Sequence, residues 1–326
     1  MNRLYFIKNP EVFQGEKYLK TNKSYFEGWY FKNVSDKNGI SFIPGINVDK
    51  DTNTNTKKAF IQVITNTSSY YINYSIDDFK FSEKPFYIKI KNNIFSKEGI
   101  HIDIKDNSQN IKIYGDIKYL NNKNIKTSNI NPNIMGSFSY IPFMECNHAI
   151  LSMKNRAEGE LFINDKIMKF ESGTGYIEKD WGTSFPKGYI WCQGNNFKNK
   201  EVSFMMSIAN IPFKLFEFTG LICDIIINDK EFKFTTYNNA KIINYSIDDN
   251  LLSIILKQKD YFLEVKSKFD KGLKLTAPVK GKMQKDIFET ILANITVTLR
   301  LKNEIIFSDT SSNCGLEMNF FVCLKT

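Results

Sequence analysis

The stretch Gly175–Asn196 concentrates the side chains of this chain that could do chemistry. It reads GYIEKDWGTSFPKGYIWCQGNN and contains two acids, Glu178 and Asp180, beside two of the three tryptophans. On a β-strand, residues two apart point to the same face, so the two carboxylates would lie together, with Lys179 on the other face. Burial against aromatic rings raises the pKa of a carboxyl group, and such a pair suits general-acid catalysis. An equally weighted alternative is that one acid pairs with Lys179 or Lys187 in a structural ion pair.

Aromatic and amide side chains supply further candidates for a site. Their rings could form an apolar wall whose π faces stabilise a developing carbocation. The candidate rings are Trp29, Tyr30, Trp181, Tyr189 and Trp191. Gln193 and Asn195 are candidate hydrogen-bond donors to a ligand oxygen. The alternative is that the tryptophans fill a hydrophobic core and that the amides cap turns.

Three other ionisable residues belong to the candidate site. Glu27, in FEGWYF, is either a charge at the rim of a barrel, which we favour, or an inward catalytic group. His148 and Glu145 share the segment PFMECNHAI and could both reach the mouth of a cavity. The other histidine, His101, is interpreted as an ordinary strand residue.

Several familiar kinds of site are excluded by the residues present. Two histidines cannot build a His-rich metal centre. The chain contains no P-loop, no G-x-G-x-x-G and no G-x-S-x-G motif. The sequence therefore predicts neither a metal nor a cofactor.

Alternation of apolar and polar residues dominates the chain and predicts β-strands. The clearest runs are residues 87–95, 100–105, 111–120 and 296–301. The segments FINDKIMKF and IINDKEFKF each predict two strands joined by an Asn-Asp-Lys turn. Residues 283–295 fit either a helical or a strand period, and no long amphipathic helix is evident. The predicted class is all-β with antiparallel strands.

A weak internal repeat predicts two related halves. At a constant offset of 162 positions, Trp29 aligns with Trp191, Phe42 with Phe204 and Ile46 with Ile208. The repeat predicts two tandem β-barrels, spanning residues 1–184 and 185–326. A closed barrel of eight to ten strands has an interior able to hold a small apolar ligand.

Charge and cysteine content limit the partners and the compartment. The formal net charge is +9, but only Arg3, Arg156 and Arg300 are arginines among 44 basic residues. Because arginine makes most bidentate contacts to phosphates and bases, we expect no nucleic-acid partner. The five cysteines, an odd number without a CxxC pair, favour neither a disulfide framework nor a zinc site. They are Cys146, Cys192, Cys223, Cys314 and Cys323.

No apolar run is long enough to predict a membrane-spanning helix. Such a helix needs roughly 18 apolar residues. The most apolar segment, Ile211–Ile227, is interrupted by Lys214, Glu217 and Asp224. We expect a soluble, reduced, cytoplasmic protein whose contact with membranes, if any, is peripheral.

The blocks FEGWYFK (residues 26–32) and GYIEKDWGTSFPKGYIWCQGNNF (residues 175–197) resemble the two signature blocks of the tocopherol cyclase family. Three further blocks fit in the same order along the chain: PFMECNHAILSM, LTAPVKGKM and CGLEMNF. The element GTGYIEKDWG is also similar, more distantly, to one in carotenoid hydratases and related two-domain lipocalin-like proteins. The resemblance implies an all-β fold of two tandem lipocalin-like antiparallel β-barrels.

The resemblance also implies a reaction, in which an isoprenoid-tailed hydroquinone closes to a chromanol. Protonation of an alkene gives a tertiary cation that the phenol oxygen captures, without a metal or a redox cofactor. The expected partner is thus a hydrophobic small molecule or an isoprenoid lipid. A carrier that binds such ligands without catalysis, and a hydratase or pericyclase acting on a lipophilic natural product, remain alternatives.

Roles for the candidate residues follow from this chemistry as hypotheses. Glu178 or Asp180 would donate the proton, and His148 and Glu145 are the second candidates for handling it. Because plant-type members of the family carry asparagine at the position of Asp180, Glu178 is the safer acid. The residues expected to line the path of the cation are Trp29, Trp181 and Trp191. Those expected to orient the ring oxygens are Tyr30, Gln193 and Asn195.

Overall fold

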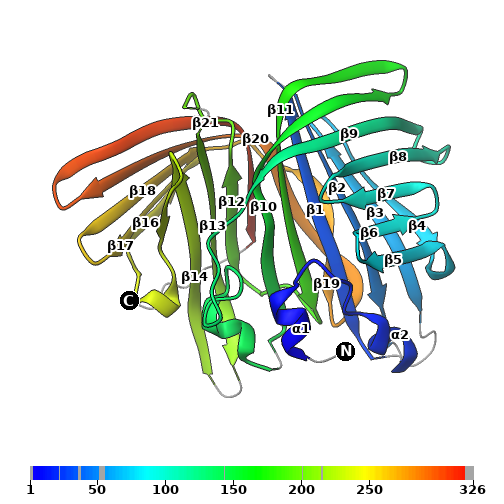
Figure 1. Ribbon diagram of the computed structural model, residues 1–326, viewed down its shortest axis with the longest axis horizontal. Helices are drawn as coiled ribbons and strands as arrows, with labels where there is room; N and C mark the ends of the chain where they lie inside the picture. Colours follow the sequence, from blue (N-terminus) through cyan, green and yellow to red (C-terminus); the bar gives the residue numbers. More distant parts are fainter. Residues whose placement is uncertain are drawn as a thin grey trace. The chain divides into compact units, whose positions relative to one another are not determined.

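The computed structural model describes residues 3–21, 23–35, 38–50, 56–142, 144–199, 201–213 and 216–319. Two of the residues considered above, Lys214 and Cys323, lie outside these ranges. The chain is almost entirely antiparallel β-structure, as the alternating pattern predicts (Figure 1). It separates into two compact units. Unit 1 comprises residues 1–124, 139–185 and 275–286, and unit 2 comprises residues 125–138, 186–274 and 287–326.

The first sheet has eleven strands in the order β4-β3-β2-β1-β11-β10-β9-β8-β7-β6-β5. These strands are β1 (Tyr25–Ser35), β2 (Asn38–Val48), β3 (Lys57–Thr65), β4 (Ser69–Ser75), β5 (Phe79–Glu83), β6 (Phe86–Ile90), β7 (Asn93–Ser96), β8 (Gly99–Asp106), β9 (Ile111–Lys123), β10 (Cys146–Ile163) and β11 (Lys166–Gly182). Two six-residue helices precede them, α1 (Arg3–Lys8) and α2 (Glu16–Thr21). Short 3-10 helices lie at Ile76–Asp78, Gly136–Tyr140 and Thr236–Asn238.

The second sheet has ten strands, with β19 paired to β20 beside the main order β15-β14-β13-β12-β21-β20-β18-β17-β16. These strands are β12 (Tyr189–Gly194), β13 (Val202–Phe213), β14 (Phe216–Ile227), β15 (Lys230–Lys233), β16 (Lys241–Asp248), β17 (Leu251–Gln258), β18 (Tyr261–Lys268), β19 (Leu273–Val279), β20 (Lys282–Leu301) and β21 (Glu304–Asn319). Residues 283–295, ambiguous in sequence, lie within the long strand β20.

Two hairpins form at the Asn-Asp turns that the sequence predicts. Asn164 and Asp165 join β10 to β11 with φ angles of 45° and 67°. Asn228 and Asp229 join β14 to β15 with φ angles of 47° and 64°. Positive φ at both central residues matches the right-handed twist of the flanking strands, and Asn and Asp tolerate it well. These turns fix the register of the strands that follow.

Each unit has its own apolar core on one face of its sheet. In unit 1 this core includes Trp29, Phe42 and Ile177. In unit 2 it includes Cys192 and Phe204. Alternate residues of the same strands point to the other face, which we call the outward face of the sheet.

The two sheets share a strand order, β4-β3-β2-β1-β11-β10 in one and β15-β14-β13-β12-β21-β20 in the other. This shared order agrees with the predicted duplication. The alignment of Trp29 with Trp191 does not hold, because Trp29 lies in the core of unit 1 and Trp191 points to the outward face of unit 2. Phe31 pairs with Phe42, whereas Gly194 pairs with Phe204, so β12 is offset from β1 by 163 positions.

The boundary predicted after residue 184 stays a prediction. The chain passes from unit 1 to unit 2 between Phe185 and Pro186, but residues 125–138 group with unit 2 and residues 275–286 with unit 1. The described cysteines form no disulfide bond with one another. None of the helices in the described residues has the length and apolar character needed to cross a membrane.

Candidate functional site

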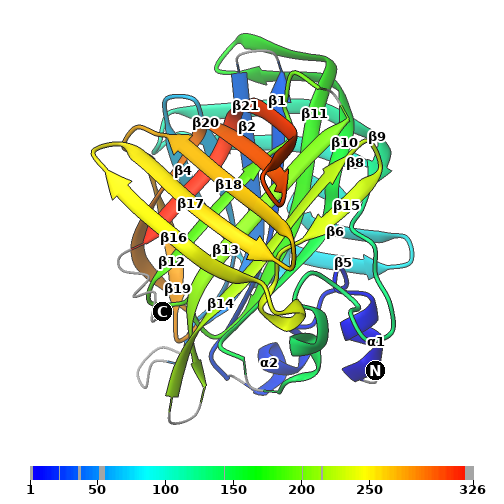
Figure 2. The ribbon, with the colours of Figure 1, turned by 90° about the vertical axis from the view of Figure 1, so that its left-hand side faces the viewer.

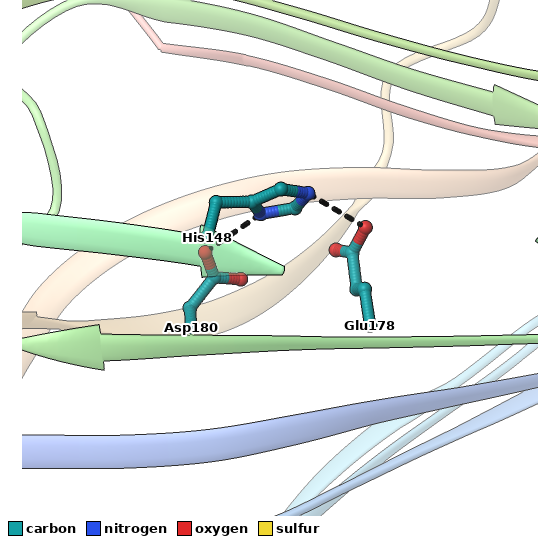
Figure 3. Close-up of side chains that lie close together, drawn as sticks. All are labelled: His148, Glu178 and Asp180. Atoms are coloured by element: carbon teal, nitrogen blue, oxygen red, sulfur yellow. Dashed lines mark hydrogen bonds and ion pairs between the residues drawn. The ribbon is translucent and has the colours of Figure 1, made fainter. Parts of the chain in front are cut away.

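A histidine that lies between two carboxylates forms a polar cluster on the outward face of unit 1. His148 on β10 lies opposite Asp180 on β11, and Glu178 is two residues before Asp180 on the same strand. The Nδ1 atom of His148 is 2.9 Å from Oδ1 of Asp180, and its Nε2 atom is 3.5 Å from Oε2 of Glu178 (Figure 3). We call these three residues the His148 cluster.

Two tyrosines on the outward face extend the His148 cluster. The Tyr176 hydroxyl donates a 2.6 Å hydrogen bond to Oε2 of Glu178. Tyr30 on β1 lies opposite Glu178 and accepts a 3.0 Å hydrogen bond from the Ser41 hydroxyl. The rings of Tyr30 and Tyr176 meet edge to face with centroids 6.5 Å apart. Acids, imidazole and phenols thus form one connected set.

Local structure explains why these side chains meet. Tyr176, Glu178 and Asp180 are two residues apart on β11, so they share a face. The Asn164–Asp165 turn sets the register between β10 and β11, and a register shift after Ile150 adjusts it beside the cluster.

The cluster is shielded from solvent but not sealed. The exposed fraction of the side chain is 13% for His148, 6% for Glu178 and 23% for Asp180. Burial lowers the pKa of His148, but the adjacent carboxylates of Asp180 and Glu178 more than compensate and raise the pKa to about 9. The imidazole is therefore a cation at neutral pH and lies between the two carboxylates.

Burial also raises the pKa of the Tyr176 hydroxyl, and the carboxylate of Glu178 raises it further. Tyr176 therefore keeps its proton and acts as a donor to Glu178. The sequence-based expectation placed the unusual proton on a carboxyl group of Glu178 or Asp180. The group of this cluster whose pKa the structure shifts to about 9 is the imidazole of His148, and the acid role of Glu178 or Asp180 stays a prediction.

The protonation of His148 can be measured directly because the chain has only two histidines. We expect an NMR titration of the imidazole signals to show one histidine, His148, with a pKa near 9. Because this value exceeds the ordinary 6.5, the protonated form stabilises the fold fully below pH 6.5. That contribution is lost as the pH rises through about 9. A His148 pKa at or below 6.5 would contradict the ion-paired geometry.

The His148 cluster also has the donor atoms of a metal site, since one ligand atom from each residue lies within 4.8 Å of the others. A metal ion would have to displace the proton from the imidazole and break the contact between Nδ1 and Asp180, because ligands must be deprotonated. The raised pKa of His148 opposes this displacement.

Glu27 and Lys179 form a second charged pair, on the core face of unit 1. Their side chains are fully buried and lie 2.5 Å apart. The ammonium group also lies 4.8 Å from the ring centre of Trp29 and 4.9 Å from that of Trp181. The predicted rim position of Glu27 is therefore wrong, because period-two alternation places it inside, opposite the face of Glu178 and Asp180.

The Glu27–Lys179 pair binds the N-terminal segment to the sheet through hydrogen bonds to the backbone of Pro10, Val12 and Gln14. Burial raises the pKa of Glu27 and lowers that of Lys179, while their mutual attraction opposes both shifts. Lys179 Nζ donates hydrogen bonds to the carbonyl oxygens of Pro10 (2.7 Å) and Val12 (2.8 Å). Glu27 accepts hydrogen bonds from the backbone amide of Gln14 (3.0 Å to Oε1) and from the hydroxyl of Tyr25 (2.9 Å to Oε2). Trp29 and Trp181 thus contact a structural ion pair, and the structure does not bring them to the His148 cluster.

The remaining candidates are Glu145 in unit 1 and four residues in unit 2. Glu145 is exposed, and its backbone carbonyl accepts hydrogen bonds from Thr183 and Ser184. Those in unit 2 are the buried residues Tyr189, Trp191, Gln193 and Asn195. The Tyr189 hydroxyl donates to Oε1 of Glu317. Roles in substrate binding for these four residues stay predictions.

Sequence reasoning missed Tyr176, although its spacing from Glu178 places it on the same face. It also missed Glu317 and Glu289, which lie opposite each other on β21 and β20 and are 7% and 2% exposed.

The offset between the two units relates these acids to the His148 cluster. With β12 offset from β1 by 163 positions, Trp191 corresponds to Gly28, the residue opposite Asp180. Because Trp191 lies opposite Glu317, Glu317 corresponds to Asp180 and Glu289 to His148.

Solved structures share this fold at low sequence identity. CghA, solved with Sch210972, superposes with a TM-score of 0.57 at 7% identity, and the match covers 91% of this chain and 89% of CghA. Kievitone hydratase from Nectria haematococca superposes with a TM-score of 0.50 at 12% identity, over 91% of this chain and 89% of its own. At such identities the likeness concerns the fold alone. No curated protein sequence matches the chain.

A family model supplies the sequence relationship that these structures do not. The model described as tocopherol cyclase-like matches residues 122–319, more than half of the chain. The matched range contains the whole His148 cluster and both tyrosine–acid pairs, Tyr176–Glu178 and Tyr189–Glu317. The chain, built from two lipocalin-like antiparallel β-barrel units, therefore belongs to the tocopherol cyclase-like family.

Proposed function

We propose that the chain is an enzyme that cyclises a prenylated hydroquinone or a related isoprenoid lipid by adding a phenol oxygen across an alkene. The observation that carries the proposal is the His148 cluster, in which a buried cationic imidazole lies between two carboxylates. Family membership supports the reaction class. The reaction is an isomerisation, so it needs no oxidant and no second substrate.

The acidity of His148 decides how the addition proceeds. A donor with a pKa near 9 is too weak to convert a simple alkene into a free cation before anything else happens. The proton transfer is therefore coupled to attack by the oxygen, so that the C–H and C–O bonds form together. The carboxylates of Glu178 and Asp180 stabilise the positive charge that develops on carbon meanwhile.

Each bond change has a named source in this scheme. The alkene π electrons form a C–H bond to the proton on Nε2 of His148, and a phenol oxygen lone pair forms the C–O bond. The phenol O–H bond breaks, and Glu178 accepts the proton. Glu178 then returns a proton to Nε2 of His148, which lies 3.5 Å from Oε2 of this carboxylate, and the starting protonation state is restored.

The tyrosines would orient the substrate and the acid. Tyr176 donates to Glu178 and so leaves the other oxygen of that carboxylate for the phenol proton. Tyr30, held by Ser41, presents a phenol beside the cluster that can bond a ring oxygen of the substrate. These roles replace those expected of Trp29 and Trp181, since both rings contact Lys179.

The names of the structural relatives fit proton-driven addition to lipophilic compounds. One relative is named a hydratase, and the other was solved with the small molecule Sch210972. Hydration differs from cyclisation only in the nucleophile, which is water in place of a phenol oxygen. Hydration is thus the second candidate reaction.

Isotopes separate these reactions in one experiment. We expect the protein, incubated with prenylated hydroquinones in D₂O, to give a cyclised isomer carrying one carbon-bound deuterium, as measured by mass spectrometry after back-exchange in H₂O. The oxygen of the product should come from the substrate, so incubation in ¹⁸O-labelled water should add no label. One ¹⁸O atom would indicate hydration instead.

The carrier alternative predicts a different outcome. A carrier would co-purify with a lipid and bind hydroquinones without changing their mass. Binding with no turnover across tail lengths from one to four prenyl units would overturn the proposed enzyme activity. Native mass spectrometry of the purified protein distinguishes this case from simple failure to bind.

A further inference from the structure

The outward face of unit 2 carries a shallow groove that the proposed reaction does not use. Its volume is about 270 Å³. It lies across β16, β17, β18 and β20, which run side by side in Figure 2. The groove is lined by Ile243, Ile255, Phe262, Glu264, Arg300, Lys302 and Asn303.

Apolar side chains at the groove are unusually exposed. Ile243 is 49% exposed and sits where the register between β16 and β17 shifts. Ile305 and Ile306, at the start of β21, are 56% and 41% exposed, and Ile305 lies opposite Arg300. A register shift beside Arg300 turns two consecutive isoleucines toward solvent. Ile243 lines the groove on β16, while Ile305 and Ile306 lie on β21, the strand next to β20, so exposed isoleucines flank the groove on two sides.

Basic side chains surround the same groove. Arg300 and Lys302 line it, and the Lys257 ammonium lies 5.3 Å from the ring centre of Phe262. The acid that lines the groove, Glu264, is neutralised by Lys266 at 2.7 Å and Arg300 at 3.6 Å. Six basic residues therefore lie at or beside the groove: Lys241, Lys257, Lys259, Lys266, Arg300 and Lys302. Three acidic residues lie among them: Asp260, Glu264 and Glu304. The surface therefore has a net positive charge of three.

We propose that this face of unit 2 docks on an anionic phospholipid bilayer. Arg300 and Lys302 would bond headgroup phosphates, while Ile243, Ile305 and Ile306 would enter the interface. Exposed apolar residues beside lysine and arginine are the usual composition of interfacial membrane-binding surfaces. The charge favours this occupant over a second copy of the chain, because a two-fold interface would bring like charges together.

Docking at this groove concerns access to lipid and does not depend on the chemistry of the His148 cluster. The groove also lies outside Ile211–Ile227, the most apolar segment of the sequence. That segment contains the whole of β14 and the end of β13, and Leu221, Cys223 and Ile225 are buried in the core.

The test is co-sedimentation of the full chain with vesicles, which uses no substrate. We expect binding to vesicles containing phosphatidylglycerol and phosphatidylcholine, and little binding to phosphatidylcholine alone. Raising the salt concentration should weaken the binding. Each basic residue near an anionic surface contributes about fivefold to the partition coefficient, so Arg300→Gln with Lys302→Gln should lower it roughly 25-fold.

Matched variants separate the surface from general charge and hydrophobicity. Lys80→Gln with Lys105→Gln removes two exposed lysines of unit 1, and Ile167→Ser removes an isoleucine that is 54% exposed there. These controls should bind as the unchanged protein does. Ile305→Ser with Ile306→Ser should lower binding at least tenfold, because two isoleucines leave the interface.

Four results would overturn the proposal. One is equal binding to neutral and anionic vesicles. Another is equal loss of binding in the control and groove variants. The third is an occupant of a different kind: inorganic phosphate that displaces the protein from vesicles at low millimolar concentration would indicate a site for a soluble anion. A concentration-dependent dimer that Ile305→Ser with Ile306→Ser abolishes would equally indicate a second copy as the occupant.

Discussion

Replacing His148 with glutamine should lower kcat/KM for the cyclisation about a thousandfold, because it removes the only cation in the cluster that can give up a proton. Glutamine keeps hydrogen-bonding groups near Asp180 and Glu178, so substrate affinity should change much less than turnover. Steady-state kinetics with the deuterium-labelled product as the readout measure both. Activity of the unchanged protein should fall as the pH rises through about 9, where His148 loses its proton.

The chain contains a matched control for this substitution. His101 contacts Asp116 through Nδ1 at 2.8 Å, a contact like that between His148 and Asp180, but both residues are largely exposed on unit 1. His101→Gln should leave kcat/KM within about twofold. If His148→Gln retained full turnover, the imidazole could not be the proton donor. Loss of turnover in Glu178→Gln would then return that role to the carboxyl group.

Replacing Lys179 with methionine should destabilise unit 1 by about 4 kcal/mol, the typical cost of breaking a buried ion pair from one side. The substitution leaves Glu27 buried without its cation, and the carbonyl groups of Pro10 and Val12 lose their donor. The midpoint of thermal unfolding should fall by about 10 °C. Calorimetry measures both quantities. The N-terminal segment should also become sensitive to limited proteolysis.

A double-mutant cycle tests whether the ion pair is the cause. The double variant Glu27→Gln with Lys179→Met should cost less than the sum of the two single substitutions, because only the double variant leaves no unpaired buried charge. Lys80→Met, at an exposed lysine, should change stability by less than about 0.5 kcal/mol. Additive effects of the two single substitutions would show that the buried charges do not stabilise each other.

The sequence predicts the parts of this fold that depend on local spacing. Alternation predicts antiparallel strands throughout, and Asn-Asp pairs predict two hairpins in which both residues have positive φ. Alternation also places Glu178 and Asp180 on one face and Lys179 on the other. Local patterns suffice here because side-chain direction along a strand follows from the chain itself.

What the sequence does not predict depends on contacts between distant segments. His148 is a secondary candidate in the sequence, and its central place comes from the pairing of β10 with β11. Glu27 is expected at a rim because nothing local shows that Lys179 and the N-terminal segment will meet it inside. Alternation also explains why Trp29 and Trp181 do not join the His148 cluster. Their side chains point to the face of the sheet opposite that of Glu178 and Asp180.

The exchange of short segments between the units is another non-local feature. Residues 125–138 group with unit 2, where Glu231 accepts a 2.8 Å hydrogen bond from the Lys126 amide. Neither composition nor periodicity distinguishes this segment from an ordinary loop. Its assignment depends on individual contacts more than a hundred residues apart.

The correspondence of His148 and Asp180 with Glu289 and Glu317 bears on how such proteins diversify. When the part of a gene that encodes one sheet is duplicated, the protein contains two copies of every position in that sheet. Selection then needs to maintain a functional residue in only one of the two copies. The first copy here holds a cation beside an acid, whereas the second holds two acids. Relatives could therefore move their reactive group from one half to the other through a few substitutions, without losing the fold that supports it.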